Sequence, residues 1–238
     1  MCFGNKPKHR IGAPLEQELI DRLKKKFYVT EDEIDTCWYK FSELDRSFDG
    51  CLDRYDIIEG VAQKSTYLLE FFFDAIGFHE NTRLKLNVVL EPMFTFLTLW
   101  RGQIYEILFQ QMDTEDLGFV HADEMHLRLC KFLGLHHYDD VARPIRDVIE
   151  KADKNKDMKI NFPEFKVLVG QLPRLLHPIF KLQNALHVFT LTAKEWTKKI
   201  EKMVLANQVR KYPLIVFCVR TQLYHSWFDL SPLINIGL

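Results

Sequence analysis

The chain has 238 residues, of which 47% are hydrophobic and 27% are charged, and its formal net charge is −1. This length allows one large domain or two small lobes with real cores, and the composition is ordinary for a soluble globular protein. The near-neutral balance gives no overall field for attraction to nucleic acid or to an anionic membrane, so we expect neither as a partner.

The cysteines and the N-terminal residues indicate the cellular location. The five cysteines are scattered and odd in number, without the spacing of a zinc site, so we expect a reducing compartment and a cytoplasmic protein. No uncharged apolar stretch approaches the roughly 18 residues that a spanning helix needs. Cys2, near Lys6 and Lys8, is a candidate for acylation, but a flexible tail over residues 1–14 is the favoured interpretation.

Helical periodicity starts close to the N-terminus. Apolar residues recur at helical spacing in the first predicted helix, at Leu15, Leu19, Ile20, Leu23 and Phe27. A second helix opens at Thr30, whose hydroxyl precedes Glu33 by three residues in the capping-box arrangement. Its apolar face ends directly before Asp45.

A twelve-residue loop pattern begins at Asp45 and ends at Asp56. Oxygen-bearing side chains stand at positions 1, 3, 5, 9 and 12, and Gly50 stands at position 6. At this spacing a tight loop can surround one hard cation with six to eight oxygens. The candidate ligands are the side chains of Asp45, Ser47, Asp49, Asp53 and Asp56 and the carbonyl of Cys51. Because Asp56 is shorter than glutamate, this second, less certain site favours Mg²⁺ relative to Ca²⁺.

The same pattern is most complete between residues 153 and 164. The candidate ligands of this main site are the side chains of Asp153, Asn155, Asp157, Asn161 and Glu164 and the carbonyl of Lys159. Met158 replaces glycine at position 6, where a left-handed turn costs a non-glycine residue on the order of 1 kcal/mol. Three lysines make the loop formally neutral. We therefore expect Ca²⁺ binding with reduced affinity.

Two further units keep the helical framework but lose ligands. Between residues 113 and 124 the pattern retains Asp113, Glu115 and Glu124, but Leu117 and His121 interrupt it. We expect this loop to bind weakly or only to pair with the last one. Around residues 79–90 the ligand positions are filled by Leu84, Leu86, Val88 and Leu90, so that unit is expected to be an inert partner of the first loop. The units form a helix–loop–helix array that repeats about every 35–40 residues.

The pattern changes after residue 172. Apolar residues from Leu175 to Phe189 form a helical stripe, with Pro178 in its first turn. We expect this helix to pack against the chain itself, with release toward a target as the alternative. Another capping box opens a last helix at Thr192. The basic cluster at residues 198–202 is expected to be a solvated face, and residues 213–238 form an apolar tail of uncertain order.

Two sequences carry a family resemblance: Asp-x-Asn-x-Asp-x-x-Ile-x-x-x-Glu in the last unit and Asp-x-Ser-x-Asp-Gly-x-Leu-x-x-x-Asp in the first. They resemble the loops of the EF-hand superfamily, and the arrangement is similar to four-hand calcineurin B-like and neuronal-calcium-sensor-like proteins. The resemblance covers roughly residues 30–172. It implies an all-α fold of two lobes, each a pair of EF-hands, at 15–100 and 101–172. C-terminal helices at 173–212 and the tail would follow.

The resemblance implies a calcium-binding regulatory protein, or calcium sensor, that binds a protein target through an apolar surface. The target segment would be helical, as EF-hand sensors prefer. The alternative is a structural EF-hand subunit of a larger assembly, with its metal structural or absent. No phosphate-binding, nucleophile-elbow or zinc-protease motif supports an enzyme. Two histidines at 136–137 are followed by two aspartates at 139–140. A solvated linker explains these residues better than a metal site.

Overall fold

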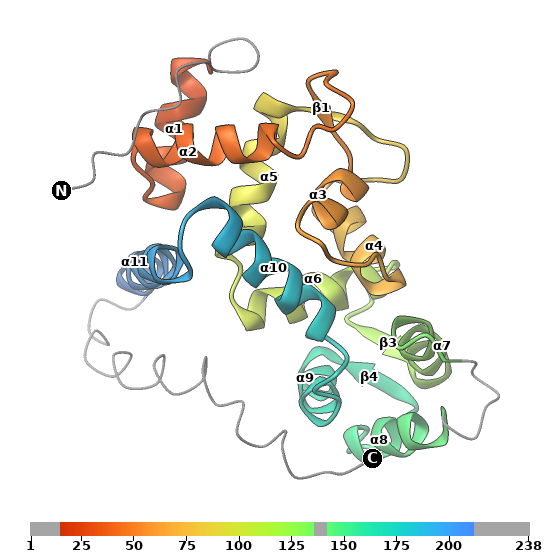
Figure 1. Ribbon diagram of the computed structural model, residues 1–238. Coiled ribbons are helices and arrows are strands. Elements are labelled where there is room, and N and C mark those ends of the chain that lie inside the picture. The colour runs from red at the N-terminus through yellow and green to blue at the C-terminus, as the bar shows by residue number, and fades with distance from the viewer. Residues whose placement is uncertain (1–14, 136–141, 212–238) are drawn as a thin grey trace.

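The computed structural model describes residues 15–135 and 142–211, with side chains described as far as residue 206. The acylation candidate Cys2, the His and Asp pairs within 136–140 and the apolar tail from residue 213 lie outside the described residues. Within these ranges the chain forms eleven helices and four short strands (Figure 1). The expected all-α fold is confirmed, because the strands are only short antiparallel pairs between loops.

The N-terminal half contains one pair of helix–loop–helix units. Its elements are α1 (Gln17–Phe27), α2 (Glu31–Ser42), β1 (Cys51–Leu52), α3 (Arg54–Gly60), α4 (Tyr67–Ala75), β2 (Leu84–Lys85) and α5 (Leu86–Thr98). The capping box at the start of α2 forms as expected, with the Thr30 hydroxyl accepting from the Glu33 amide at 3.3 Å. Strand β1 pairs antiparallel with β2, so that Leu52 faces Leu84. The degenerate second unit thus partners the first.

The second pair of units follows directly. Its elements are α6 (Arg101–Met112), β3 (Phe119–His121), α7 (Ala122–Phe132), α8 (Arg143–Ala152), β4 (Lys159–Asn161) and α9 (Phe162–Gln171). Strands β3 and β4 form an antiparallel ribbon in which Val120 faces the fully buried Ile160. The loop at 113–124 therefore pairs with the last loop, and a β-branched residue such as Ile160 suits the ribbon between them. In Figure 1 this pair lies at the lower right, away from α1 and α2.

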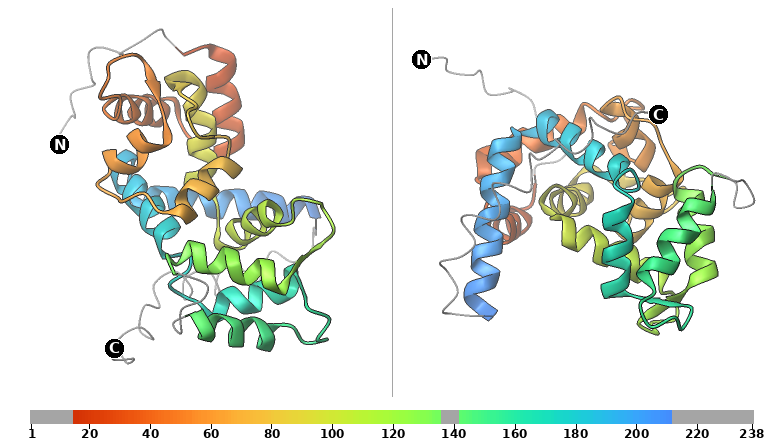
Figure 2. Two further views of the ribbon diagram at one scale, coloured as in Figure 1. Left: turned by 90° about the vertical axis from the view of Figure 1, so that its right-hand side faces the viewer. Right: turned by 90° about the horizontal axis from the view of Figure 1, so that it is seen from below.

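The last two helices, α10 (His177–Thr190) and α11 (Ala193–Lys211), fold back on the N-terminal pair. Helix α10 contacts α2, α4 and α5, and α11 contacts α1 and α5; Figure 2 shows both helices from two further sides. Pro178 lies in the first turn of α10, as expected. The expectation that this helix packs against its own chain is therefore confirmed.

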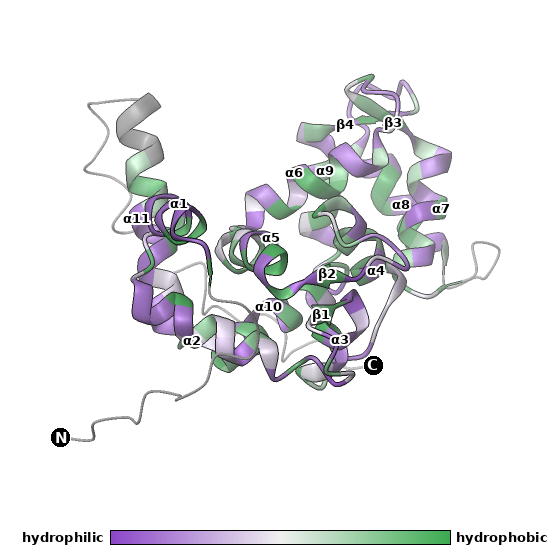
Figure 3. Ribbon diagram, turned by 90° about the horizontal axis from the view of Figure 1, so that it is seen from above, coloured by the Kyte–Doolittle hydropathy of each residue, from purple (hydrophilic) through white to green (hydrophobic). Residues whose placement is uncertain are grey.

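Aromatic side chains form much of the core. The Phe94 ring on α5 lies edge-on to Phe27, at a centroid distance of 5.7 Å, and to Trp196 of α11, at 5.6 Å. Figure 3 shows hydrophobic residues along α5 in the middle of the molecule. Val88 is the exception on this helix: it is 50% exposed rather than part of the apolar framework. Among the described helices, none has both the length and the apolar character that crossing a bilayer requires.

One expectation about α11 is wrong. The basic cluster at its middle is not uniformly solvated: Lys198 and Lys202 are exposed, but Lys199 is buried. Its ammonium group lies 2.7 Å from a carboxylate oxygen of Glu33. The helical period places Lys199 on the same side as Trp196 and Ile200, next to the apolar face.

Candidate metal-binding loops

Three loops share one backbone design, which we number by unit: loop 1 (45–56), loop 3 (113–124) and loop 4 (153–164). In each, φ is positive at positions 4 and 6; the residues are Phe48 and Gly50, Asp116 and Gly118, and Lys156 and Met158. In each, the amide at position 6 donates to the aspartate at position 1, over 2.7, 2.7 and 2.9 Å. The loop conformation is therefore the same whether or not glycine stands at position 6.

Loop 4 places its two principal carboxylates inside the loop. The Asp153 and Glu164 side chains belong to residues only 6% and 7% exposed. Glu164 extends from the first turn of α9 back to the loop start, where one carboxylate oxygen accepts from the Lys154 amide at 3.2 Å. Its other oxygen accepts from the Asn161 amide at 3.1 Å, completing a capping box. Positions 1 and 12 therefore face the same space from the ends of two helices.

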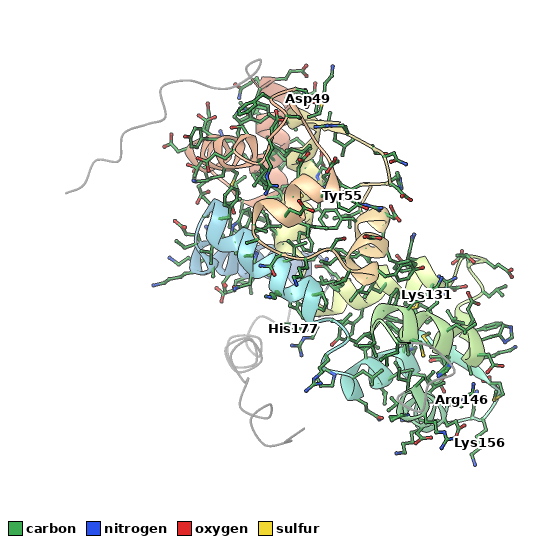
Figure 4. All side chains as sticks on the ribbon, turned by 45° about the vertical axis from the view of Figure 1, so that its right-hand side comes forward. Asp49, Tyr55, Lys131, Arg146, Lys156 and His177 are labelled. Carbon is green, nitrogen blue, oxygen red and sulfur yellow. The ribbon has the colours of Figure 1, made fainter. Side chains whose placement is uncertain are left out.

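The remaining loop 4 groups surround that space from the exposed side. Asp157 accepts from the Lys159 amide at 2.9 Å and from the Asn155 side-chain amide at 2.9 Å. Lys154 and Lys156 are exposed, and Figure 4 shows labelled Lys156 at the edge of the molecule far from Asp49 of loop 1. The Lys159 ammonium group lies 4.2 Å from the centroid of the Phe119 ring, on the partner strand. The lysines thus extend away from the loop interior.

The donor set of loop 4 suits a hard cation. Carboxylates, side-chain amides and one backbone carbonyl are the oxygen ligands that Ca²⁺ takes, and their number matches its coordination. Within residues 15–135 and 142–206, no three His, Cys, Asp or Glu side chains form a ready-made metal cluster. The loop 4 oxygens would therefore have to move closer together around an ion.

In loop 1 an arginine side chain lies among the candidate oxygens. The guanidinium of Arg83, which comes from the degenerate second unit, donates to Ser47 Oγ at 2.8 Å and to Asp49 Oδ1 at 3.1 Å. It also donates to the Cys51 carbonyl at 3.3 Å and lies 3.7 Å from Asp56 Oδ2. These are the candidate groups at positions 3, 5, 7 and 12. The loop 1 oxygens are therefore brought together, but around a side chain.

The electrostatics of loop 1 favour a positive group beside Asp56. Burial raises the pKa of Asp56, and the charges of Asp53 and Asp45 raise it further. Hydrogen bonding from the Asp53 amide and the charge of Arg83 oppose this shift without cancelling it. Crowded carboxylates repel one another, so a positive group among them stabilises all of them.

Loop 3 departs from the pattern at its last ligand. Glu124 turns outward to Arg128, one helical turn along α7, and accepts from its Nε at 3.0 Å and from its Nη2. Leu117 is 52% exposed at position 5, and the His121 ring lies edge-on to Phe119 at 5.4 Å. Of the three weak candidates, only Asp113 directs both oxygens into the loop, toward the Leu117 and Gly118 amides.

Sequence reasoning missed both arginines. Arg128 had a detectable signal, because a glutamate and an arginine four residues apart on a helix commonly pair. Arg83 had none within loop 1, since it reaches that loop only through the β1–β2 ribbon. In the second unit, around residues 79–90, Leu86 and Leu90 are buried.

Comparison with known proteins gives distant relatives over about 59–65% of the chain. No protein-family model matches the chain. The calcineurin B protein of Yarrowia lipolytica is 24% identical over 159 residues, covering 65% of this chain and 91% of that protein. The calcineurin B protein of Schizosaccharomyces pombe is 21% identical over 157 residues, covering 65% and 90%. Calcium-dependent protein kinase 34 of Arabidopsis thaliana is 22% identical over 145 residues, covering 59% of this chain and 27% of the kinase.

A solved structure is also similar in sequence. The coelenterazine-binding protein of Renilla muelleri, in its calcium-loaded apo form, is 21% identical and covers 66% of this chain and 97% of that one. Its TM-score of 0.25 is too low for a comparison of the two folds. The paired loops and the calcineurin B matches nevertheless agree with each other: both support an EF-hand protein with the calcineurin B-like arrangement of hands.

Proposed function

We propose that this protein is a non-enzymatic, calcium-responsive regulatory protein whose main ion site is loop 4. The single observation that carries the proposal is the burial of Asp153 and Glu164 at the two ends of that loop, facing one interior. Asn155, Asp157, Asn161 and the Lys159 carbonyl would supply the remaining oxygens. Bound calcium would supply the charge that draws these oxygens together and fixes the ends of α8 and α9.

A route from loop 4 to the N-terminal pair follows from the chain path. Helix α9 begins within loop 4, and only five residues separate its end from the start of α10. A change in the direction of α9 on ion binding, as in sensor EF-hands, would therefore pull on α10. We propose that α10 is the element through which calcium acts.

The surface under α10 is the proposed binding site for a partner. Ile179, Leu182 and Leu186 are fully buried along one face of α10, which contacts α2, α4 and α5. A helical segment of a partner with the same apolar spacing could take the place of α10 when it is released. A protein partner is also consistent with the name of the two calcineurin relatives, each of which is called a subunit. The proposal includes a cytoplasmic location and no membrane partner.

Loops 1 and 3 have subordinate roles in this proposal. At loop 1 a Mg²⁺ ion, with its need for few protein ligands, would be favoured over Ca²⁺, but either ion must displace Arg83. At loop 3, Asp113, Glu115 and Glu124 are at most weak ligands, because Arg128 holds Glu124.

A structural role within a larger assembly is the second candidate, and a specific observation favours it. Gln183 and His187 of α10 bond the backbone carbonyls of Phe96, Leu97 and Leu99 at 2.7–2.9 Å. Buried bonds of this kind are costly to break, since the carbonyls would lose their partners. On this view α10 never leaves, and calcium in loop 4 is a structural ion.

One pair of measurements separates the two candidates. Calcium titration calorimetry on the full chain should show a loop 4 site that Glu164→Gln abolishes, while the matched change Glu124→Gln in loop 3 leaves it intact. Hydrogen exchange of α10 amides should then accelerate with calcium if the chain is a regulator. Binding without faster exchange supports the structural role. A calcium titration that Glu164→Gln does not alter contradicts the assignment of loop 4.

A further inference from the structure

Arg83 lies in loop 1 as a bound ion would. A single guanidinium nitrogen, Nη2, lies 2.8 to 3.3 Å from three oxygens, those of Ser47, Asp49 and Cys51. The Asp56 carboxylate lies 3.7 Å from the same nitrogen. Four of the six groups that the sequence assigns to an ion therefore lie within 3.7 Å of one nitrogen of a positively charged guanidinium, whose side chain remains 40% exposed.

The fold holds Arg83 in this place. It directly precedes β2, and the antiparallel register sets Leu84 opposite Leu52, in the middle of loop 1. Asn81, two residues earlier, has φ of 60°, a left-handed turn that asparagine tolerates well. The degenerate second unit thus contributes two things to loop 1: the strand that pairs with it and the guanidinium that contacts its oxygens.

The other arginines near loop 1 are engaged elsewhere. Arg46 pairs with Glu59 at 3.5 Å, and the buried Arg54 pairs with Asp74 at 3.2 Å. Within the described ranges, the ion pairs of Asp49 and Asp56 are both made with Arg83. The planar fork of arginine suits several oxygens at once, and its charge does not titrate at physiological pH.

We propose that Arg83 is the resident cation of loop 1: it holds the first hand in its EF-hand form without a divalent ion, and an ion binds there only by displacing it. The N-terminal pair, including the surface covered by α10, is then assembled at any calcium concentration. This inference concerns loop 1 alone and does not depend on ion binding in loop 4.

The test counts bound ions on the full chain by equilibrium dialysis, with Ca²⁺ and with Mg²⁺, after treatment with EDTA. Arg83→Ala should gain one bound ion per chain relative to the unchanged protein, and adding Asp45→Asn should remove that gain. In EDTA, Arg83→Ala should lower the Tm, and added Ca²⁺ or Mg²⁺ should restore it. The matched control is Lys85→Ala, which also removes one positive charge, from an exposed residue of β2. It should neither gain a bound ion nor lower the Tm in EDTA.

Two results overturn the proposal. One is a loss of bound ion when Asp45→Asn is introduced with Arg83 intact, at an ion concentration that just saturates the added site of Arg83→Ala, which would show that Arg83 does not compete with the ion. The other is an Arg83→Ala protein that gains no ion. If Arg83→Ala fails to fold even with divalent ions, Arg83→Lys replaces it: this variant should fold in EDTA and gain no ion, and a gain of an ion would contradict the proposal.

Discussion

Lys199 of α11 donates hydrogen bonds to both carboxylate oxygens of Glu33 on α2, at 2.7 and 2.8 Å, across 166 residues of sequence. Glu33 also accepts from the Thr30 amide in the capping box of α2. Burial raises the pKa of Glu33, but bonding from Lys199 and Thr30 outweighs it, so that the pKa is lowered on balance. The last helix is therefore fastened to the N-terminal pair at the point where α2 begins.

Lys199→Met should destabilise the protein by about 1–3 kcal/mol, because it leaves the Glu33 carboxylate without its charged partner. Urea unfolding at neutral pH measures the change. Lys198→Met, at the exposed neighbouring residue, should change the free energy of unfolding by less than about 0.5 kcal/mol. A double-mutant cycle with Glu33→Gln should show coupling between the two residues. Additive effects would mean that the ion pair contributes nothing of its own.

Loop 3 should become an ion site only when three obstacles are removed together. Leu117→Asp and His121→Asp restore oxygens at positions 5 and 9, and Arg128→Ala frees Glu124 from its ion pair. The triple variant should bind one more Ca²⁺ per chain than the unchanged protein in calorimetry. The same two aspartate changes with Arg128 retained should bind that ion more weakly. Equal affinities would show that Arg128 does not compete for Glu124.

The sequence predicted local features well and distant ones poorly. The capping boxes at Thr30 and Thr192 and the turn position of Met158 depend on neighbouring residues, and all three are present. The ribbon between loops follows from the repeat itself. The exposed Val88 shows that an apolar residue in the second unit is not buried at every position.

Contacts between separate units could not be read from the sequence. Arg83 and Lys199 bond the carboxylates of Asp49 and Glu33, which lie 34 and 166 residues away in sequence. Helical period relates a side chain to the apolar face of its own helix. It does not identify the acidic group that a buried lysine or arginine contacts, because that contact depends on how the units pack against one another.

Met158→Gly should raise the free energy of unfolding by up to about 1 kcal/mol. Met158 has φ of 61°, and a left-handed conformation costs a residue with a Cβ on that order; the greater freedom of glycine in the unfolded chain offsets part of the gain. The reciprocal change in loop 3, Gly118→Ala at φ of 78°, should destabilise by a similar amount. Urea unfolding of both variants tests these two predictions. A Met158→Gly protein that is less stable than the unchanged protein would show that the left-handed conformation of Met158 is not strained.

Stability should fall as the pH drops below about 6.5, through His187. Its Nε2 lies 2.7 Å from the Leu97 carbonyl, which can only accept, so Nε2 carries the proton of a neutral ring. Burial lowers the pKa of His187, and the bond to Leu97 only partly opposes this. The unfolded chain therefore takes up a proton at a higher pH than the folded chain. Between the two pKa values, unfolding is favoured by acid.

Urea midpoints at pH 7.5 and pH 5.5 measure this loss. His187→Gln removes the titrating ring but keeps a donor near Leu97, so its midpoint should change less with pH than that of the unchanged protein. His177→Gln, at the exposed start of α10, should keep the full pH dependence. Because His187 joins α10 to the end of α5, hydrogen exchange of the α10 amides should accelerate in the same pH range. If His187→Gln and the unchanged protein lose stability in parallel, the acid sensitivity arises elsewhere and α10 is not held by a neutral histidine.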